Sequence, residues 1–90
     1  SFISVTKILP SVFDSVSKNM DLLILVKPQF EAERSDVKKG GLIFDHEIHA
    51  RTVSKVGKSA IELGARVRGV IKSPITGAAG NREFFLWLTK

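Results

Sequence analysis

An uninterrupted apolar run near the start of the chain restricts the possible folds most. Five aliphatic residues, Leu22 to Val26, lie between Asp21 and the pair Lys27-Pro28. A short continuous run bounded in this way indicates a strand that is buried on both faces, as in a parallel sheet. Pro28 has no amide hydrogen to donate to a neighbouring strand, so the strand should end near Lys27.

Two amphipathic helices are predicted, one on each side of this strand in the sequence. Apolar residues at steps of three and four predict a first helix from about Ser4 to Lys18, which Pro10 should kink or delay. Asp45 is the expected N-cap of a second helix that ends at Gly64. One face of that helix carries Ile48, Thr52, Val56, Ala60 and Leu63.

The remaining segments predict a loop and two further strands. Residues 29–44 are polar and contain a glycine pair, which predicts a loop. Residues 65–73 alternate with Arg66, Arg68 and Lys72 on one face, although Val70 is out of step. A glycine-rich loop then leads to an aromatic strand over residues 83–88, which should form a hairpin with the preceding strand. A strand-helix-strand unit implies a right-handed parallel crossover, so the expected class is α/β with about three strands and two helices.

The charge of the chain points to a polyanionic partner. The net charge is +5 and the isoelectric point is about 9.9, so RNA or DNA are the first partners to consider. A soluble domain that is merely basic is the alternative. There is no cysteine, which excludes disulfides and cysteine-ligated zinc and fits a reducing compartment such as the cytoplasm. No apolar run approaches the length of a membrane span.

Two short motifs do not predict the sites that they resemble. Gly57-Lys58-Ser59 lacks the earlier glycine of a phosphate-binding loop and lies within a predicted helix. His46 and His49 are three residues apart, whereas a zinc-protease helix spaces its histidines by four. We therefore expect no metal site.

Lys27 and Glu83 are the charged residues whose positions suggest chemistry. Lys27 ends the buried strand, and ligands of parallel sheets bind beyond the carboxyl ends of the strands. Glu83 opens the aromatic strand and could pair with Lys27 across adjacent strand ends. The alternatives are a lysine that extends from the strand end to water and a glutamate that faces solvent.

Four segments together resemble one known family. They are Ser1 to Ser4; Leu-Val-Lys-Pro-Gln-Phe-Glu-Ala at 25–32; Lys-Gly-Gly at 39–41 with Asp45 and His49; and Ser-Pro-Ile-Thr-Gly-Ala-Ala-Gly-Asn-Arg-Glu at 73–83. They are similar to the hemolysin A-like (TlyA/FtsJ-type) ribose 2′-O-methyltransferases, in the right order along essentially the whole chain. One departure is His46, where the family often has proline.

The resemblance implies a fold, a reaction and two site residues. Residues 1–90 would form the C-terminal half of a Rossmann-like methyltransferase domain, with the last strand inserted antiparallel between the other two. Such enzymes transfer a methyl group from S-adenosylmethionine to a ribose 2′-hydroxyl, here expected in ribosomal RNA. Lys27 and Glu83 match two members of the family's Lys-Asp-Lys-Glu tetrad. The other two and the glycine-rich cofactor loop lie upstream of Ser1, so this chain alone should be inactive.

RNA is the expected partner of the basic residues in the polar loop. The basic residues Arg34, Lys38 and Lys39 could contact RNA phosphates, or they could belong to a solvated charged loop. A non-catalytic RNA-binding domain of the same ancestry is the alternative function. Membrane activity is suggested by the hemolysin name alone. Because the family pairs the strand Asp21 to Lys27 with an upstream strand, the isolated chain is expected to self-associate through that edge.

Overall fold

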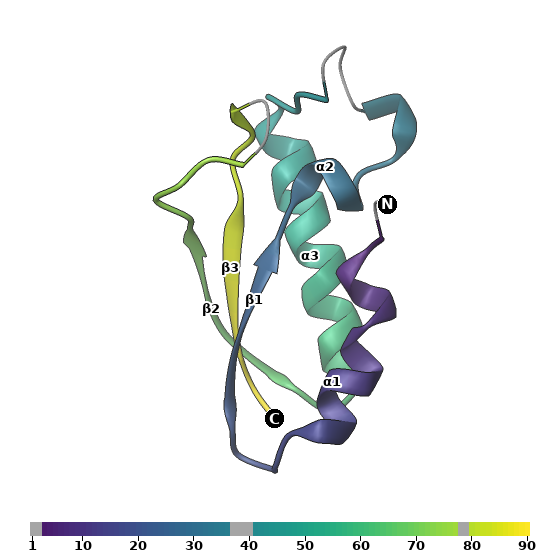
Figure 1. The fold of residues 1–90 in the computed structure, drawn as a ribbon, viewed down its shortest axis with the longest axis vertical. Helices are drawn as coiled ribbons and strands as arrows, with labels where there is room; N and C mark the ends of the chain where they lie inside the picture. Colours follow the sequence, from purple (N-terminus) through teal and green to yellow (C-terminus); the bar gives the residue numbers. More distant parts are fainter. Residues whose placement is uncertain (1–2, 37–40, 78–79) are drawn as a thin grey trace.

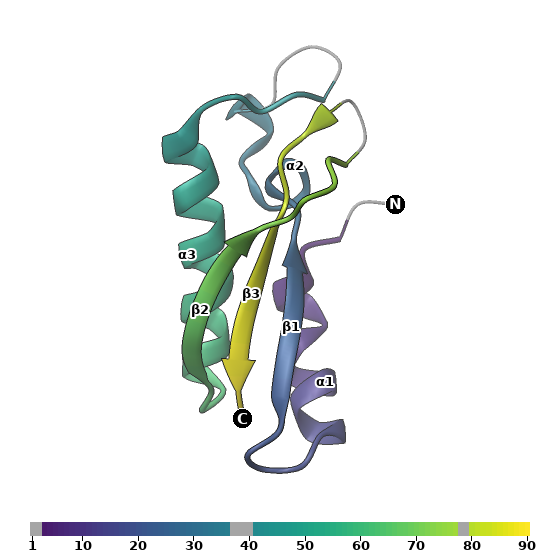
Figure 2. The same ribbon diagram turned by 90° about the vertical axis from the view of Figure 1, so that its left-hand side faces the viewer.

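The computed structural model describes residues 3–36, 41–77 and 80–90 and has an α/β architecture. Figures 1 and 2 show a single sheet with the two longer helices on the same side of it. In chain order the elements are η1 (Val5–Lys7), α1 (Leu9–Ser15), β1 (Asp21–Val26), α2 (Pro28–Glu31), η2 (Arg34–Asp36), α3 (His46–Glu62), β2 (Arg66–Lys72) and β3 (Phe84–Thr89).

The sheet has the strand order β1-β3-β2, and β3 runs antiparallel to both neighbours. The last strand is therefore inserted between the other two, as the resemblance implied, and β1 and β2 are parallel to each other. Phe84 at the start of β3 pairs with Val26 on one side and Lys72 on the other. The carboxyl ends of both parallel strands thus meet at the end of the sheet where β3 begins.

The first helix is shorter than the single helix predicted from Ser4 to Lys18. The chain forms the 3-10 helix η1, with Ser4 as its side-chain N-cap, and the regular helix α1 begins only at Leu9. Pro10 lies in the first turn of α1, where its missing amide hydrogen is tolerated. The expected delay by Pro10 is confirmed, and α1 ends at Ser15.

The second predicted helix is α3, and its signals are confirmed. The Asp45 carboxylate accepts a hydrogen bond from the Glu47 amide at 2.8 Å, and Gly64 after the helix has a φ of 95°. Four of the five predicted face residues are buried, whereas Leu63 at the C-cap is exposed. The buried core joins α1, α3 and the sheet through Leu9, Phe13, Val26, Val56, Ala60, Ala65, Leu86 and Leu88.

The prediction that β1 is buried on both faces is wrong for this chain. Val26 is fully buried, but Leu23 on the opposite face is 63% exposed. Ile71 and Trp87 are also exposed on that face, which we call the open face of the sheet. The longer helices α1 and α3 both lie on the other face (Figure 1), and none of the described helices lies over these apolar side chains.

Two other expectations are corrected by local geometry. The predicted loop over residues 29–44 includes the short helices α2 and η2. The prediction that Arg66, Arg68 and Lys72 share one face is wrong for Lys72. A register shift between Val67 and Gly69 leaves Arg68 with no pairing partner in β3, so Lys72 lies on the same face as Val70 and opposite to Arg66. The extra residue Arg68 lets Val67 and Val70 both face α3, opposite Leu88 and Leu86.

Candidate active site

The topology brings Lys27 and Glu83 to the same end of the sheet. Val26 is the last residue of β1 and pairs with Phe84, the first residue of β3. Lys27 follows Val26 in the chain, and Glu83 precedes Phe84, so the two residues occupy adjacent strand ends. This is the position beyond the carboxyl ends of parallel strands where such sheets bind ligands.

Lys27 is held by the turn that follows β1. Its carbonyl oxygen accepts hydrogen bonds from the amides of Phe30, at 2.8 Å, and Glu31, at 3.2 Å. Its side chain is half-buried, and Nζ lies 5.2 Å from the centroid of the Phe30 ring, a cation–π distance. The short helix α2 therefore fixes the backbone of Lys27 and provides the ring that its amine contacts.

Glu83 is a buried carboxylate, so the alternative of a glutamate that faces solvent is wrong. The residue is 6% exposed, and its Oε2 accepts a hydrogen bond from Gln29 Nε2 at 2.9 Å. The ion pairs among the described residues are Arg51–Asp36 and Lys55–Glu31, and Lys27–Glu83 is not one of them. Burying a carboxylate costs free energy that a hydrogen bond from a neutral amide offsets only in part, which makes Glu83 a candidate for a functional role.

Gly77 lies against the same carboxylate oxygen of Glu83. A Cβ atom at residue 77 would be 1.9 Å from Glu83 Oε2, so only glycine allows the backbone to approach this closely. The surrounding turn is held by hydrogen bonds from the Gly77 amide to the Asn81 carbonyl, at 2.8 Å, and from the Gly80 amide to the Gly77 carbonyl, at 3.0 Å. Gln29 and Gly77 thus confine Glu83, and sequence reasoning assigned neither a role.

Asn81 joins two of the segments that carry the family resemblance. Its buried side chain accepts a hydrogen bond from the Ile43 amide at 2.9 Å and donates one to the Gly41 carbonyl at 2.7 Å. Asn81 therefore fastens the segment before α3 to the turn that precedes Glu83. Its neighbours His49 and Ile43 are joined as well, through His49 Nε2 and the Ile43 carbonyl at 2.9 Å.

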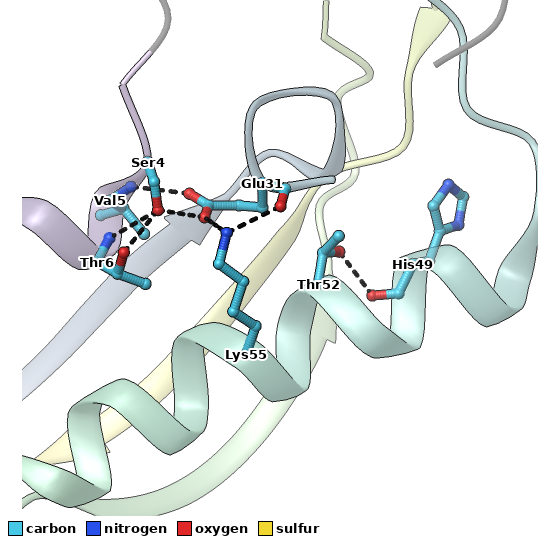
Figure 3. A network of polar contacts seen from close by, with 7 residues as sticks. All are labelled: Ser4, Val5, Thr6, Glu31, His49, Thr52 and Lys55. Atoms are coloured by element: carbon cyan, nitrogen blue, oxygen red, sulfur yellow. Dashed lines mark hydrogen bonds and ion pairs between the residues drawn. The ribbon is translucent and has the colours of Figure 1, made fainter. Parts of the chain in front are cut away.

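A second buried carboxylate, Glu31, connects the N-terminal segment to α2 and α3 (Figure 3). It accepts hydrogen bonds from Ser4 Oγ at 2.5 Å and from the Val5 amide at 2.8 Å. Lys55 on α3 lies 3.4 Å from the same carboxylate and donates to the Glu31 carbonyl at 2.9 Å. Glu31 is four residues after Lys27, so this network anchors the far end of the turn that carries the lysine.

Of the three predicted RNA contacts, the structure describes the backbone of Arg34 alone. Arg34 is the first residue of η2, whereas Lys38 and Lys39 lie outside the described residues. Their contacts with RNA stay predictions. Within the described ranges, no group of three or more His, Cys, Asp or Glu side chains could hold a metal ion. None of the helices that the structure describes is long and apolar enough to cross a membrane.

Comparisons with known proteins agree on one family. The family described as FtsJ-like methyltransferase matches residues 1–90. The chain is 44% identical over 88 residues to the 16S/23S rRNA (cytidine-2′-O)-methyltransferase TlyA of Mycobacterium tuberculosis, covering 98% of this chain and 33% of that protein. It is 42% identical over 84 residues to hemolysin A of Brachyspira hyodysenteriae, covering 93% and 35%.

A solved structure supports the same assignment. A hemolysin-like protein of Lactococcus lactis superposes with a TM-score of 0.94 and 47% sequence identity, covering 100% of this chain and 43% of that one. The chain spans about one third of the length of the curated relatives that it matches. By its sequence over all 90 residues and by its fold, this chain belongs to the FtsJ-like methyltransferase family.

Proposed function

We propose that the whole protein methylates a ribose 2′-hydroxyl of ribosomal RNA with S-adenosylmethionine, and that residues 1–90 are the C-terminal half of its catalytic domain. The observation that supports this most is the buried carboxylate of Glu83, which Gln29 and Gly77 confine beside the strand end that carries Lys27. The activity of TlyA, a 16S/23S rRNA (cytidine-2′-O)-methyltransferase, supports the choice of ribosomal RNA and of the 2′-oxygen.

S-adenosylmethionine supplies a methyl group on a positively charged sulfur. A ribose hydroxyl is a poor nucleophile while it keeps its proton, so the attack needs a base or a charge that stabilises the developing alkoxide. Lys27 would take this role, because the residue follows the last position of β1 at this end of the sheet. Glu83 would hold the lysine or the ribose in the geometry of attack. The described residues would activate and position the ribose hydroxyl, and we assign none of them to binding of the cofactor.

The test is methyl transfer by the full-length protein. The protein is incubated with ribosomal RNA and S-adenosylmethionine labelled in its methyl group, and the RNA is digested to nucleosides for mass spectrometry. We expect label in 2′-O-methylnucleosides and none when the 90-residue chain replaces the full-length protein. Label on a base would contradict the proposed 2′-oxygen.

RNA binding without any transfer would instead support a non-catalytic RNA-binding domain. The net charge of +5 suits that alternative equally well. RNA binding alone does not explain the confined carboxylate of Glu83. A ribosomal RNA substrate would place the protein in the cytoplasm.

A further inference from the structure

A cavity of about 530 Å³ lies between the first turns of α3, the end of β2 and the start of β3. Figure 2 shows the end of β2 beside α3 at this level of the molecule. The volume of the cavity is in the range of sites that hold small molecules or single residues of a polymer. Val53, Val70 and Phe84 contribute apolar surface, and His46, Lys72 and Arg82 contribute polar groups.

The charge of the cavity is of one sign. Lys72 and Arg82 are exposed, and neither forms an ion pair with any residue that the structure describes. None of the described residues that line the cavity is acidic. Two cations beside an apolar surface suit a ligand that has both a phosphate and a flat apolar group, and a nucleotide combines these.

The cavity adjoins the candidate active site through three consecutive residues. Arg82 and Phe84 both line the cavity, whereas Glu83 between them contacts Gln29 and Gly77. Alternation along an extended chain places neighbouring side chains on opposite sides, so the two sites lie back to back across this segment. If the ribose of an RNA strand lies at Glu83, a neighbouring nucleotide would have to cross this segment to enter the cavity.

We propose that this cavity is a second RNA subsite that takes a nucleotide adjacent to the methylated one. Lys72 and Arg82 contact its phosphate, and the surface around Val53 and Phe84 contacts its base. The inference rests on the proposed function, because it assumes that the RNA strand passes Lys27 and Glu83. The proposed subsite is a different surface from the basic segment that contains Arg34, Lys38 and Lys39.

The experiment measures RNA affinity of full-length variants by fluorescence anisotropy with labelled fragments of 16S and 23S ribosomal RNA. Lys72→Glu reverses a charge at the cavity, and Ala50→Leu fills the cavity without changing charge. Lys18→Glu, in the turn at the opposite end of the sheet, is the matched charge control. We expect each cavity variant to weaken binding about tenfold, and Lys72→Glu to lower the slope of log K against log salt by about 1.

The expected pattern also leaves the RNA affinity of the Lys18→Glu control close to wild type. Cavity variants that bind RNA like Lys18→Glu would overturn the subsite. If Lys72→Glu weakens binding and Ala50→Leu does not, the contact is a diffuse electrostatic one and the subsite is also overturned. Failure of the proposed function would be seen separately, as a wild-type protein that binds RNA but transfers no methyl group.

Discussion

At the scale of single residues, Gln29 sets the position of the Glu83 carboxylate. Its amide nitrogen donates to Glu83 at 2.9 Å, and its Oε1 is buried with no hydrogen-bond partner among the described residues. An amide that leaves one buried acceptor unsatisfied bears a cost of about 1–3 kcal/mol. The cost is accounted for if the orientation of the Gln29 side chain is set by its hydrogen bond to the Glu83 carboxylate.

Gln29→Leu in the full-length protein is therefore expected to lower kcat about tenfold to a hundredfold with little change in KM, because a displaced carboxylate spoils the geometry of attack and not the binding of RNA. Steady-state methyl transfer measures both constants. The same substitution made together with Glu83→Gln should have almost no further effect, since Gln29 acts through Glu83. Equal losses in both backgrounds would show that Gln29 has a different role.

The positions of Lys27 and Glu83 could be predicted, but their surroundings could not. The apolar run and the proline define a strand end at Lys27, and the family resemblance identifies both residues. The roles of Gln29 and Gly77 could not be predicted, because they depend on contacts with Glu83, which is distant from Gln29 in the chain. A glycine in a glycine-rich loop gives no signal that its missing Cβ makes room for a carboxylate.

At the scale of elements, the Glu31 network holds η1, α2 and α3 together. Glu31→Gln should lower the free energy of unfolding of the full-length protein by about 1–3 kcal/mol, because the uncharged amide keeps the shape but weakens the bonds from Ser4 and Val5. Lys55→Met should cost about 1 kcal/mol or less, since the Lys55 side chain is 49% exposed. Urea unfolding measures both, and a larger loss for Lys55→Met would contradict this ranking.

A second element-scale prediction concerns the end of the sheet where β1 begins. Hydrogen bonds from Thr89 Oγ1 and Trp87 Nε1, with the nearby charge of Arg68, hold the pKa of Asp21 below its usual value of 3.8. Asp21 therefore binds a proton more readily in the unfolded chain than in the folded one. The charged Asp21 carboxylate stabilises the fold at pH values above its usual pKa, and this stabilisation is lost as the pH falls through the lower pKa of the folded state.

The measurement is urea unfolding at a series of pH values from about pH 5 down to about pH 2.5. Asp21→Asn should make the fall of unfolding free energy with decreasing pH shallower. Asp14→Asn, which removes an exposed carboxylate on α1, is the matched control. An identical pH dependence for Asp21→Asn and wild type would show that the hydrogen bonds to Thr89 and Trp87 do not stabilise the charged form.

Elements with strong local signals could be predicted, whereas short ones could not. Asp45 and Gly64 define α3 because capping is a local property of the chain. The four-residue helix α2 is too short to show a helical period, and tertiary contacts through Glu31 hold it in place. The insertion of β3 between β1 and β2 came from the family resemblance, because an order of strands leaves no periodic trace in the sequence.

At the scale of the whole molecule, the open face of the sheet favours association. Leu23, Ile71 and Trp87 are exposed there, and β1 pairs with β3 alone among the described strands. An apolar strand with an unpaired edge is a template for pairing with another chain. We expect the 90-residue chain to self-associate, as seen by sedimentation velocity.

The location of the contact can be tested with two matched substitutions. Leu23→Lys places a charge on the open face at the edge strand and should shift the chain toward monomer. Ile61→Lys makes the same change at an exposed position of α3 and should have little effect. A stable monomer at high concentration would contradict the prediction, and equal effects of the two substitutions would place the contact elsewhere.

The central claim is that Lys27 serves the chemistry of methyl transfer and not the stability of the fold. Single-turnover transfer to ribosomal RNA by the full-length Lys27→Ala variant tests it most directly, with unfolding free energy and RNA affinity measured on the same preparation. The account predicts a loss of rate of about a hundredfold to ten-thousandfold, while stability changes by about 1 kcal/mol or less and RNA still binds. Near-wild-type transfer, or a variant that unfolds, would contradict it.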